Sequence, residues 1–106
     1  METFHAHIYY KKETFEKAKA IVRSATNKEG VTVGRMHERA VGPHPTWSCQ
    51  LLFSKENLTN MMIWLLENRR GLSIFMHPVT GDDLLDHTEH AIWLGEKYDL
   101  NLDILS

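Results

Sequence analysis

The chain is poor in the residues that cross-link small secreted proteins. Its 106 residues include a single cysteine, Cys49, so an internal disulfide is excluded. A lone cysteine is typical of proteins from a reducing compartment, and we therefore predict a cytoplasmic protein. The surrounding residues, WSCQLLF, indicate a small core side chain rather than a nucleophile.

Long apolar runs and blocks of one charge are also missing. No apolar stretch approaches the length of a membrane span, and the N-terminus lacks the basic-then-apolar pattern of a signal peptide. The 12 basic residues are balanced by 14 acidic ones and form no cluster, which removes the electrostatic footprint of nucleic-acid binding. We predict no membrane partner and no nucleic-acid partner.

The chain contains no linker and no internal repeat, so we expect one domain over residues 1–106. Hydrophobic periodicity predicts strands at residues 3–10, 31–38, 46–53 and 72–77, and helices at 14–28 and 54–69. The resulting order, βαββαβ, is that of an α+β ferredoxin-like fold with two helices on one face of an antiparallel sheet. A short helix at about 82–94 and an edge strand at about 100–104 are expected after it.

The seven histidines are the most informative residues that the chain does contain. Strand alternation places four of them on the sheet face away from the helices: His5, His7, His37 and His77. We assume the usual strand order 4-1-3-2, with the first and third strands parallel. These histidines and the loop that carries His44 then meet at one edge of the sheet.

Two histidines two residues apart on a strand, such as His5 and His7, lie roughly 6.5–7 Å apart at Cα. Both imidazoles therefore reach one ion at about 2.0–2.1 Å, and His77 would complete a facial set with open positions. Imidazole suits iron, zinc, copper or nickel, so the ligands alone do not identify the metal. A carboxylate ligand stays open, from one of four nearby residues: Asp82, Asp83, Asp86 and Glu89.

Each histidine taken alone has a simpler explanation. A His-Ala-His pattern on an open sheet face is more often solvated than metal-bound, and His90 is typical of a helix surface. Two other functions therefore remain open. One is a non-catalytic metal- or small-ligand-binding protein that uses the same histidines. The other is a dimerisation domain whose open sheet face is the subunit interface.

Three segments together resemble the DOPA 4,5-dioxygenase family over nearly the whole chain: HAHIYY, GRMHERAVGPHPTWSCQLLF and NRRGLSIFMHPVTGDDLLDHTEHAIWLGE. The resemblance implies a ferredoxin-like fold and oxygen-dependent extradiol cleavage of a catechol such as L-DOPA. It also implies non-haem Fe2+, which Zn2+ or Ni2+ can replace in a purified sample, and a homodimer. The family pattern has histidine at His5, His7, His37, His44, His77 and His87, and it does not include His90.

The resemblance also suggests a role for each candidate residue. The metal ligands would be His5, His7 and His77, and the acid and base catalysts would be His44 and His87 on segments at the rim. The substrate contacts would come from His37, from Arg35 or Arg39 through a carboxylate, and from Trp47 or Phe75 through the ring.

Overall fold

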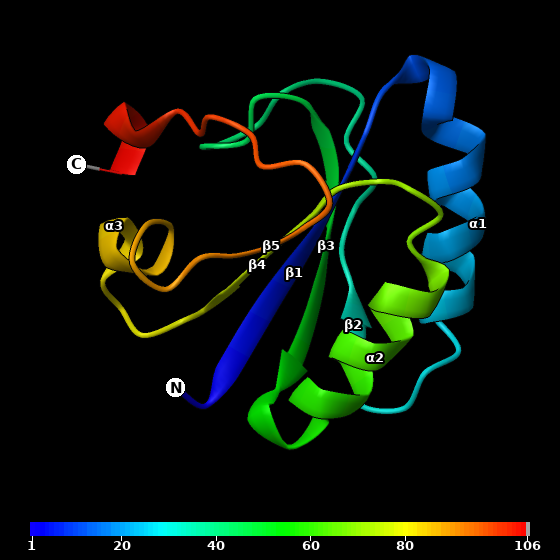
Figure 1. The fold of residues 1–106 in the computed structure, drawn as a ribbon, viewed down its shortest axis with the longest axis horizontal. Helices are drawn as coiled ribbons and strands as arrows, with labels where there is room; N and C mark the ends of the chain where they lie inside the picture. Colours follow the sequence, from blue (N-terminus) through cyan, green and yellow to red (C-terminus); the bar gives the residue numbers. More distant parts are fainter. Residues whose placement is uncertain (106) are drawn as a thin grey trace.

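The structure is a computed structural model, and it describes residues 1–105. One five-stranded sheet has the order β2-β3-β1-β4-β5. Its strands are β1 (Thr3–Tyr10), β2 (Thr32–Val33), β3 (Trp47–Ser54), β4 (Ile74–Pro78) and β5 (Ile92–Leu94). Helices α1 (Phe15–Ala25) and α2 (Leu58–Asn68) cover one face of it (Figure 1). The predicted ferredoxin-like α+β fold is confirmed.

Strand alternation and helical spacing together build the core between the sheet and the two helices. Phe4, Ala6 and Ile8 of β1 point into this layer, and their neighbours on β3 and β4 do the same. Helix α1 buries Ala18, Ile21, Val22 and Ala25 at helical spacing, and α2 buries Met61 and Leu65. The apolar face of the sheet is therefore the one that the sequence predicts.

The directions of the strands differ from our expectation that the first and third strands are parallel. Strand β1 is antiparallel to both of its neighbours, β3 and β4, and β2 is also antiparallel to β3. A helical crossover makes β1 and β2 parallel to each other, and β3 is inserted between them. The start of β3 therefore lies at the opposite end of the sheet from the start of β1.

The second strand is much shorter than the predicted residues 31–38. After Val33 the chain remains close to β3, because the amide groups of Gly34 and His37 donate to the carbonyls of Gln50 and Ser48 at 2.7 and 3.0 Å. The close approach depends on Gly34, since a Cβ there would lie 3.2 Å from the Gln50 carbonyl oxygen. The regular ladder is lost, and residues 34–46 form a long loop.

The predictions for the C-terminal region were also wrong in detail. The expected helix at about 82–94 is reduced to α3 (Asp83–Asp86), and the edge strand is β5 rather than residues 100–104. The β-branched and aromatic residues Ile92 and Trp93 pair with the free edge of β4, and this contact overrides the helical spacing. Leu102–Leu105 form a 3-10 helix instead of a strand.

A second layer covers the sheet face that we expected to be open. The 34–46 loop, α3 and the C-terminal segment lie on this side, opposite α1 and α2 (Figure 1). The amide of Asn101 donates to the carbonyl of Pro43 at 2.9 Å, which ties the C-terminal segment to the loop. As a result, His7, Tyr9, Phe75 and His77 are buried.

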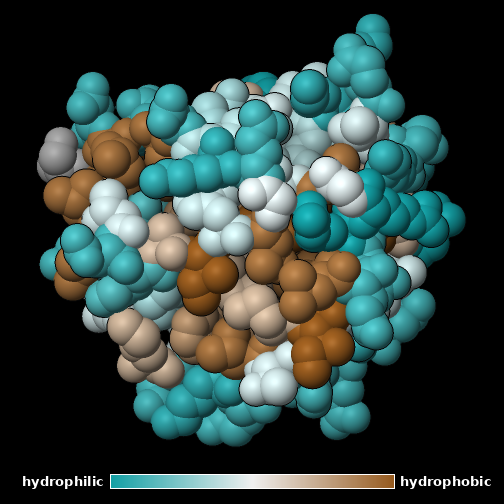
Figure 2. Space-filling model, in the orientation of Figure 1, coloured by the Kyte–Doolittle hydropathy of each residue, from teal (hydrophilic) through white to brown (hydrophobic). Residues whose placement is uncertain are grey.

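An apolar area remains on the outer surface, between β5 and α2 (Figure 2). The side chains of Ile63 and Leu66 on α2 are 50% and 56% exposed. Within residues 1–105, no helix is long and apolar enough to cross a membrane.

The buried hydroxyl of Tyr10 fixes the start of the covering loop, because it donates to the carbonyl of His37 at 2.8 Å and lies 3.1 Å from that of Ser48. We expect Tyr10→Phe to lower the free energy of unfolding by about 1–2 kcal/mol, since the variant leaves these acceptors without the donor. Urea unfolding followed by circular dichroism measures the change. Tyr98→Phe is the matched control, and equal stability of the two variants would contradict this role of Tyr10.

Candidate metal centre

Three histidines converge because β1 and β4 are adjacent. His5 lies directly opposite His77 in the strand register, and His7 follows on the same face. The Nε2 atoms of His7 and His77 are 3.1 Å apart. One ring nitrogen from each of His5, His7 and His77 lies within 4.8 Å of the other two. The structure therefore brings together the three residues that we predicted as metal ligands.

The hydrogen bonds around the cluster fix the protons on two imidazole rings. The Nδ1–H of His77 donates to the Pro78 carbonyl at 2.8 Å, because a carbonyl oxygen can only accept. The Nδ1–H of His87 likewise donates to the Asp83 carbonyl at 2.6 Å. In the neutral form, the Nε2 atom of each ring carries the lone pair, which is the form that binds a metal or accepts a proton.

Burial favours the neutral form of the three predicted ligands, His5, His7 and His77. Burial lowers the pKa of His77 to about 4, although the hydrogen bond to Pro78 opposes the change. Burial and the neighbouring His44 hold the pKa of His7 well below its ordinary value. The pKa of half-buried His5 is lowered for the same reason, with a smaller contribution from His87. Neutral imidazole is the form required of a metal ligand.

The donor set fits a transition-metal ion. Two nitrogen ligands at about 2.0–2.1 Å from one ion, at angles between roughly 90° and 109°, are about 2.8–3.4 Å apart. The 3.1 Å separation of the His7 and His77 nitrogens lies in this range. Among residues 1–105, no Asp or Glu belongs to the group.

The buried carboxylate of Asp86 lies nearby but has other partners. Asp86 accepts the amide and the hydroxyl of Thr80, both at 2.7 Å, and the Nδ1–H of His90 at 3.0 Å. Burial raises the pKa of Asp86, but these hydrogen bonds outweigh it and lower the pKa overall. Asp86 therefore holds α3 in place, and His90 belongs to this network rather than to the metal cluster.

Two further histidines extend the cluster. The ring of His44 lies 4.1 Å from that of His7, and the ring of His87 lies 4.1 Å from that of His77. A pocket of about 240 Å³, which we call the histidine pocket, is lined by all five of these residues: His5, His7, His44, His77 and His87. The predicted acid and base candidates therefore share one cavity with the predicted ligands.

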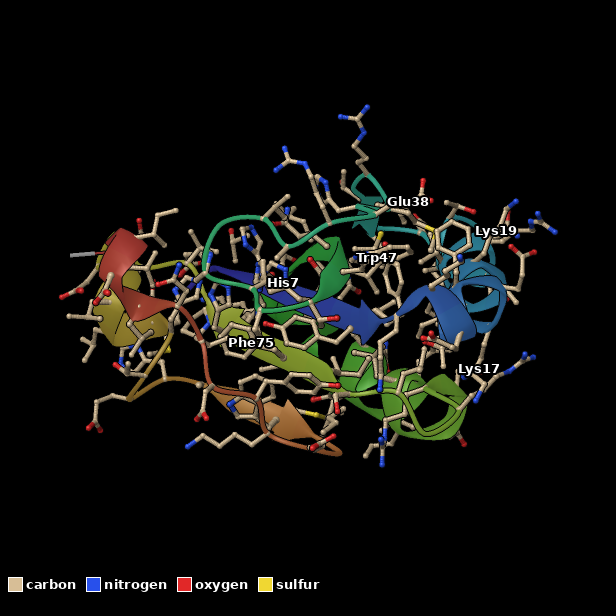
Figure 3. The ribbon with its side chains drawn as sticks, turned by 90° about the horizontal axis from the view of Figure 1, so that it is seen from above. His7, Lys17, Lys19, Glu38, Trp47 and Phe75 are labelled. Carbon is tan, nitrogen blue, oxygen red and sulfur yellow. The ribbon has the colours of Figure 1, made fainter. Side chains whose placement is uncertain are left out.

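The residues predicted to contact the substrate do not line the histidine pocket. His37 lines a smaller adjoining pocket of about 180 Å³ that also contacts His7 and His44. Arg35 and Arg39 are exposed on the loop, and neither lines a pocket described within residues 1–105. Trp47 packs against Tyr10 and Phe15 toward α1, apart from His7 and Phe75 (Figure 3).

Sequence reasoning gave no role to Tyr9, which the structure places beside the cluster. Its hydroxyl lies 2.8 Å from Nδ1 of His44. The bond joins β1 to the 34–46 loop and orients the His44 ring over His7. The alternation of His5, His7 and Tyr9 on one face is the signal that could have found it.

The fold and this cluster define a small α+β protein with a buried tri-histidine centre. A family model described as the Dopa 4,5-dioxygenase family matches residues 4–104. The chain therefore belongs to the DOPA 4,5-dioxygenase family.

Individual relatives agree with this assignment. The chain is 30% identical to a DOPA 4,5-dioxygenase of Amanita muscaria, over 96% of the chain and 49% of the relative. It is 34% identical to an uncharacterized 21.2 kDa protein of Botryotinia fuckeliana, over 96% of the chain and 62% of that protein. The chain thus spans about half to three-fifths of the length of these curated relatives.

A solved structure shows the same fold. The crystal structure of a protein from Nostoc punctiforme, described as a "putative dioxygenase", superposes with a TM-score of 0.96 at 33% identity. The match covers 99% of this chain and 91% of the Nostoc chain.

The metal-free protein should lose stability as the pH falls from about 6.5 to about 4. In the unfolded chain, His44 and His77 take up protons near 6.5, whereas burial lowers both pKa values to about 4 in the folded protein. The unfolded state therefore binds more protons in this window, so the free energy of unfolding decreases with falling pH and this contribution levels off below about 4. Urea unfolding across this pH range measures the slope.

His44→Gln is the matched variant, because glutamine cannot take up the proton. Its unfolding free energy should depend less steeply on pH than that of the unmodified protein. Equal slopes would contradict a neutral, buried His44.

Proposed function

We propose that this single-domain protein is an extradiol dioxygenase that cleaves the ring of DOPA or a related catechol with O2, using Fe2+ held by His5, His7 and His77. The observation that carries the proposal is the meeting of three neutral imidazoles in a pocket lined by two more. Membership of the family supports the same activity. When bound, ferrous iron would supply the Lewis-acid and redox chemistry through which a catechol reacts with dioxygen.

The other residues of the pocket have roles in binding and proton transfer. In its neutral form His87 carries its lone pair on Nε2, because its Nδ1–H is donated to Asp83, and this atom can accept a catechol proton. His44, oriented by Tyr9, is the second acid–base candidate. Buried Phe75 packs against His7 and His77 at centroid distances of 5.7 and 5.2 Å and helps to hold these two rings in place. Arg35, Arg39 and Trp47 have no role in this proposal, while His37 borders the site.

A homodimer in the cytoplasm is part of the same proposal. The family resemblance supports the dimer, and the exposed Ile63 and Leu66 provide an apolar area of the kind that subunit interfaces bury. Sedimentation velocity measures the oligomeric state. For the compartment, the lone buried Cys49 supports a reducing environment.

The main test is anaerobic loading with Fe2+ followed by addition of air-saturated buffer containing L-DOPA or 4-methylcatechol. We expect oxygen uptake in proportion to the catechol consumed, together with a yellow ring-opened chromophore. An oxygen electrode and absorbance spectra measure both. Tight metal binding without oxygen uptake from any catechol would instead support a non-catalytic metal-binding protein.

His7→Ala should remove metal and activity together. It deletes the buried central ligand, so we expect metal affinity to fall at least about 100-fold. Metal content by mass spectrometry and oxygen uptake measure the effect. His90→Gln is the matched control, because His90 lies outside the cluster and a glutamine amide can still donate to Asp86, so the variant should keep both metal and turnover.

The same variant separates a site from an interface. If His7→Ala keeps its metal but changes the sedimentation coefficient, the histidine face is a subunit contact rather than a metal centre.

A further inference from the structure

A second pocket, of about 430 Å³, adjoins the histidine pocket on the side of the C-terminal segment, and we call it the outer pocket. His87 lines both pockets. The 3-10 helix Leu102–Leu105 also lines both, with Leu102 in the outer pocket and Leu105 in the histidine pocket. The two cavities are therefore immediate neighbours, and the proposed chemistry leaves the larger one without a role.

A row of aromatic rings leads from the histidines into the outer pocket. Phe75, which packs against His7 and His77, stacks on Trp93 at 4.6 Å with an interplanar angle of 21°. Trp93 in turn stacks on Tyr98 at 6.3 Å and 16°. Trp93 and Tyr98 both line the outer pocket. Phe75 itself is buried, so Trp93 and Tyr98 are the rings that would meet the remaining part of a molecule whose own ring lies beside the histidines.

The outer pocket also carries both signs of charge. Lys97 supplies an ammonium group, and Glu89 and Asp99 supply carboxylates. All three side chains are exposed, and none takes part in an ion pair described within residues 1–105. A purely anionic ligand would meet two carboxylates and a purely cationic one would meet Lys97. A group with one charge of each sign complements this lining best.

We propose that the outer pocket binds the zwitterionic α-amino acid end of the substrate while the catechol ring lies in the histidine pocket. Lys97 binds the substrate carboxylate, and Glu89 and Asp99 face its ammonium group. The inference rests on the proposed function and deepens it, because it assigns substrate choice to residues that the sequence did not indicate as substrate contacts. Lys97 takes the role that we had expected of Arg35 or Arg39.

Four catechols separate the two charges: L-DOPA carries both, 3-(3,4-dihydroxyphenyl)propanoate only the carboxylate, dopamine only the ammonium, and 4-methylcatechol neither. Calorimetric titration of the Fe2+-loaded protein under nitrogen gives each Kd, and oxygen uptake gives each KM. We expect Lys97→Gln to raise both constants about tenfold or more for L-DOPA and the propanoate, because a charge-assisted contact is lost. The constants for dopamine and 4-methylcatechol should not rise.

Two further variants make the test specific. The double variant Glu89→Gln/Asp99→Asn should weaken binding of L-DOPA and dopamine but not of the propanoate. Lys19→Gln removes a lysine from α1, on the far side of the sheet, and should leave all four catechols unaffected (Figure 3). Circular dichroism confirms that each variant is folded.

The outcomes that overturn the inference differ from those that overturn the proposed function. Equal effects of Lys97→Gln on all four catechols, or no effect on any, would overturn the role of Lys97. So would an unmodified protein that binds L-DOPA no more tightly than 4-methylcatechol. Failure of the proposed function appears separately, as an absence of oxygen uptake with every catechol. In that case the dissociation constants measured under nitrogen still show whether the outer pocket binds the charged groups.

Discussion

The pairing of β1 with β4 is the contact on which the candidate site depends. It places His5 opposite His77 and brings the Nε2 atoms of His7 and His77 to 3.1 Å. The register is set from the other face of the sheet, where the apolar partners of these histidines pack beneath α1 and α2. A slip of one residue would turn Ala6 and Ile8 away from the core and the histidines into it. The hydrophobic core thus determines the geometry of a polar site that it does not touch.

Covering the histidine face gives the imidazoles their chemical character. On an open sheet these rings would titrate near their ordinary pKa, because water would stabilise the protonated form. Under the 34–46 loop and the C-terminal segment, burial lowers the pKa values of His44 and His77 to about 4. Both rings are therefore held in the neutral form, although the nearby Asp86 carboxylate opposes the effect at His77. A metal ion and protons compete for the same lone pairs, so metal affinity should weaken as the pH falls toward these values.

The sequence predicted those features that depend on local periodicity. Alternation along residues 3–10 correctly separated Ala6 and Ile8 from His5 and His7, and the βαββαβ order led to the right neighbours for each strand. The directions of the strands and the position of the edge strand were wrong, because both follow from how distant segments pack. Residues 92–94 form a strand only because β4 offers a free edge.

The position of His44 also depends on long-range packing and could not be predicted from the sequence. Its approach to His7 requires the loop to fold back across the sheet, and the bonds that hold it there are long-range. They join Tyr9 to His44 and Asn101 to Pro43. The pattern "VGPHP" indicates a loop but says nothing about where that loop lies. Arg35 and Arg39 were predicted as substrate contacts for their charge, and Arg35 also for its place on the histidine face of a predicted strand. Lys97 was not predicted, because nothing local connects residue 97 to the histidines.

Asp86 explains how a short helix can position a candidate catalytic residue. Four residues of α3 have little intrinsic stability. The buried carboxylate of Asp86 binds the amide and hydroxyl of Thr80 and the ring of His90, which ties both flanks of the helix together. Asp82 adds a cap by accepting the amide of Leu85 at 3.0 Å. His87 follows at once and is thereby held against His77, on the boundary between the histidine pocket and the outer pocket. Three of the four acidic residues considered as metal ligands in the sequence, Asp82, Asp83 and Asp86, thus support the position of His87.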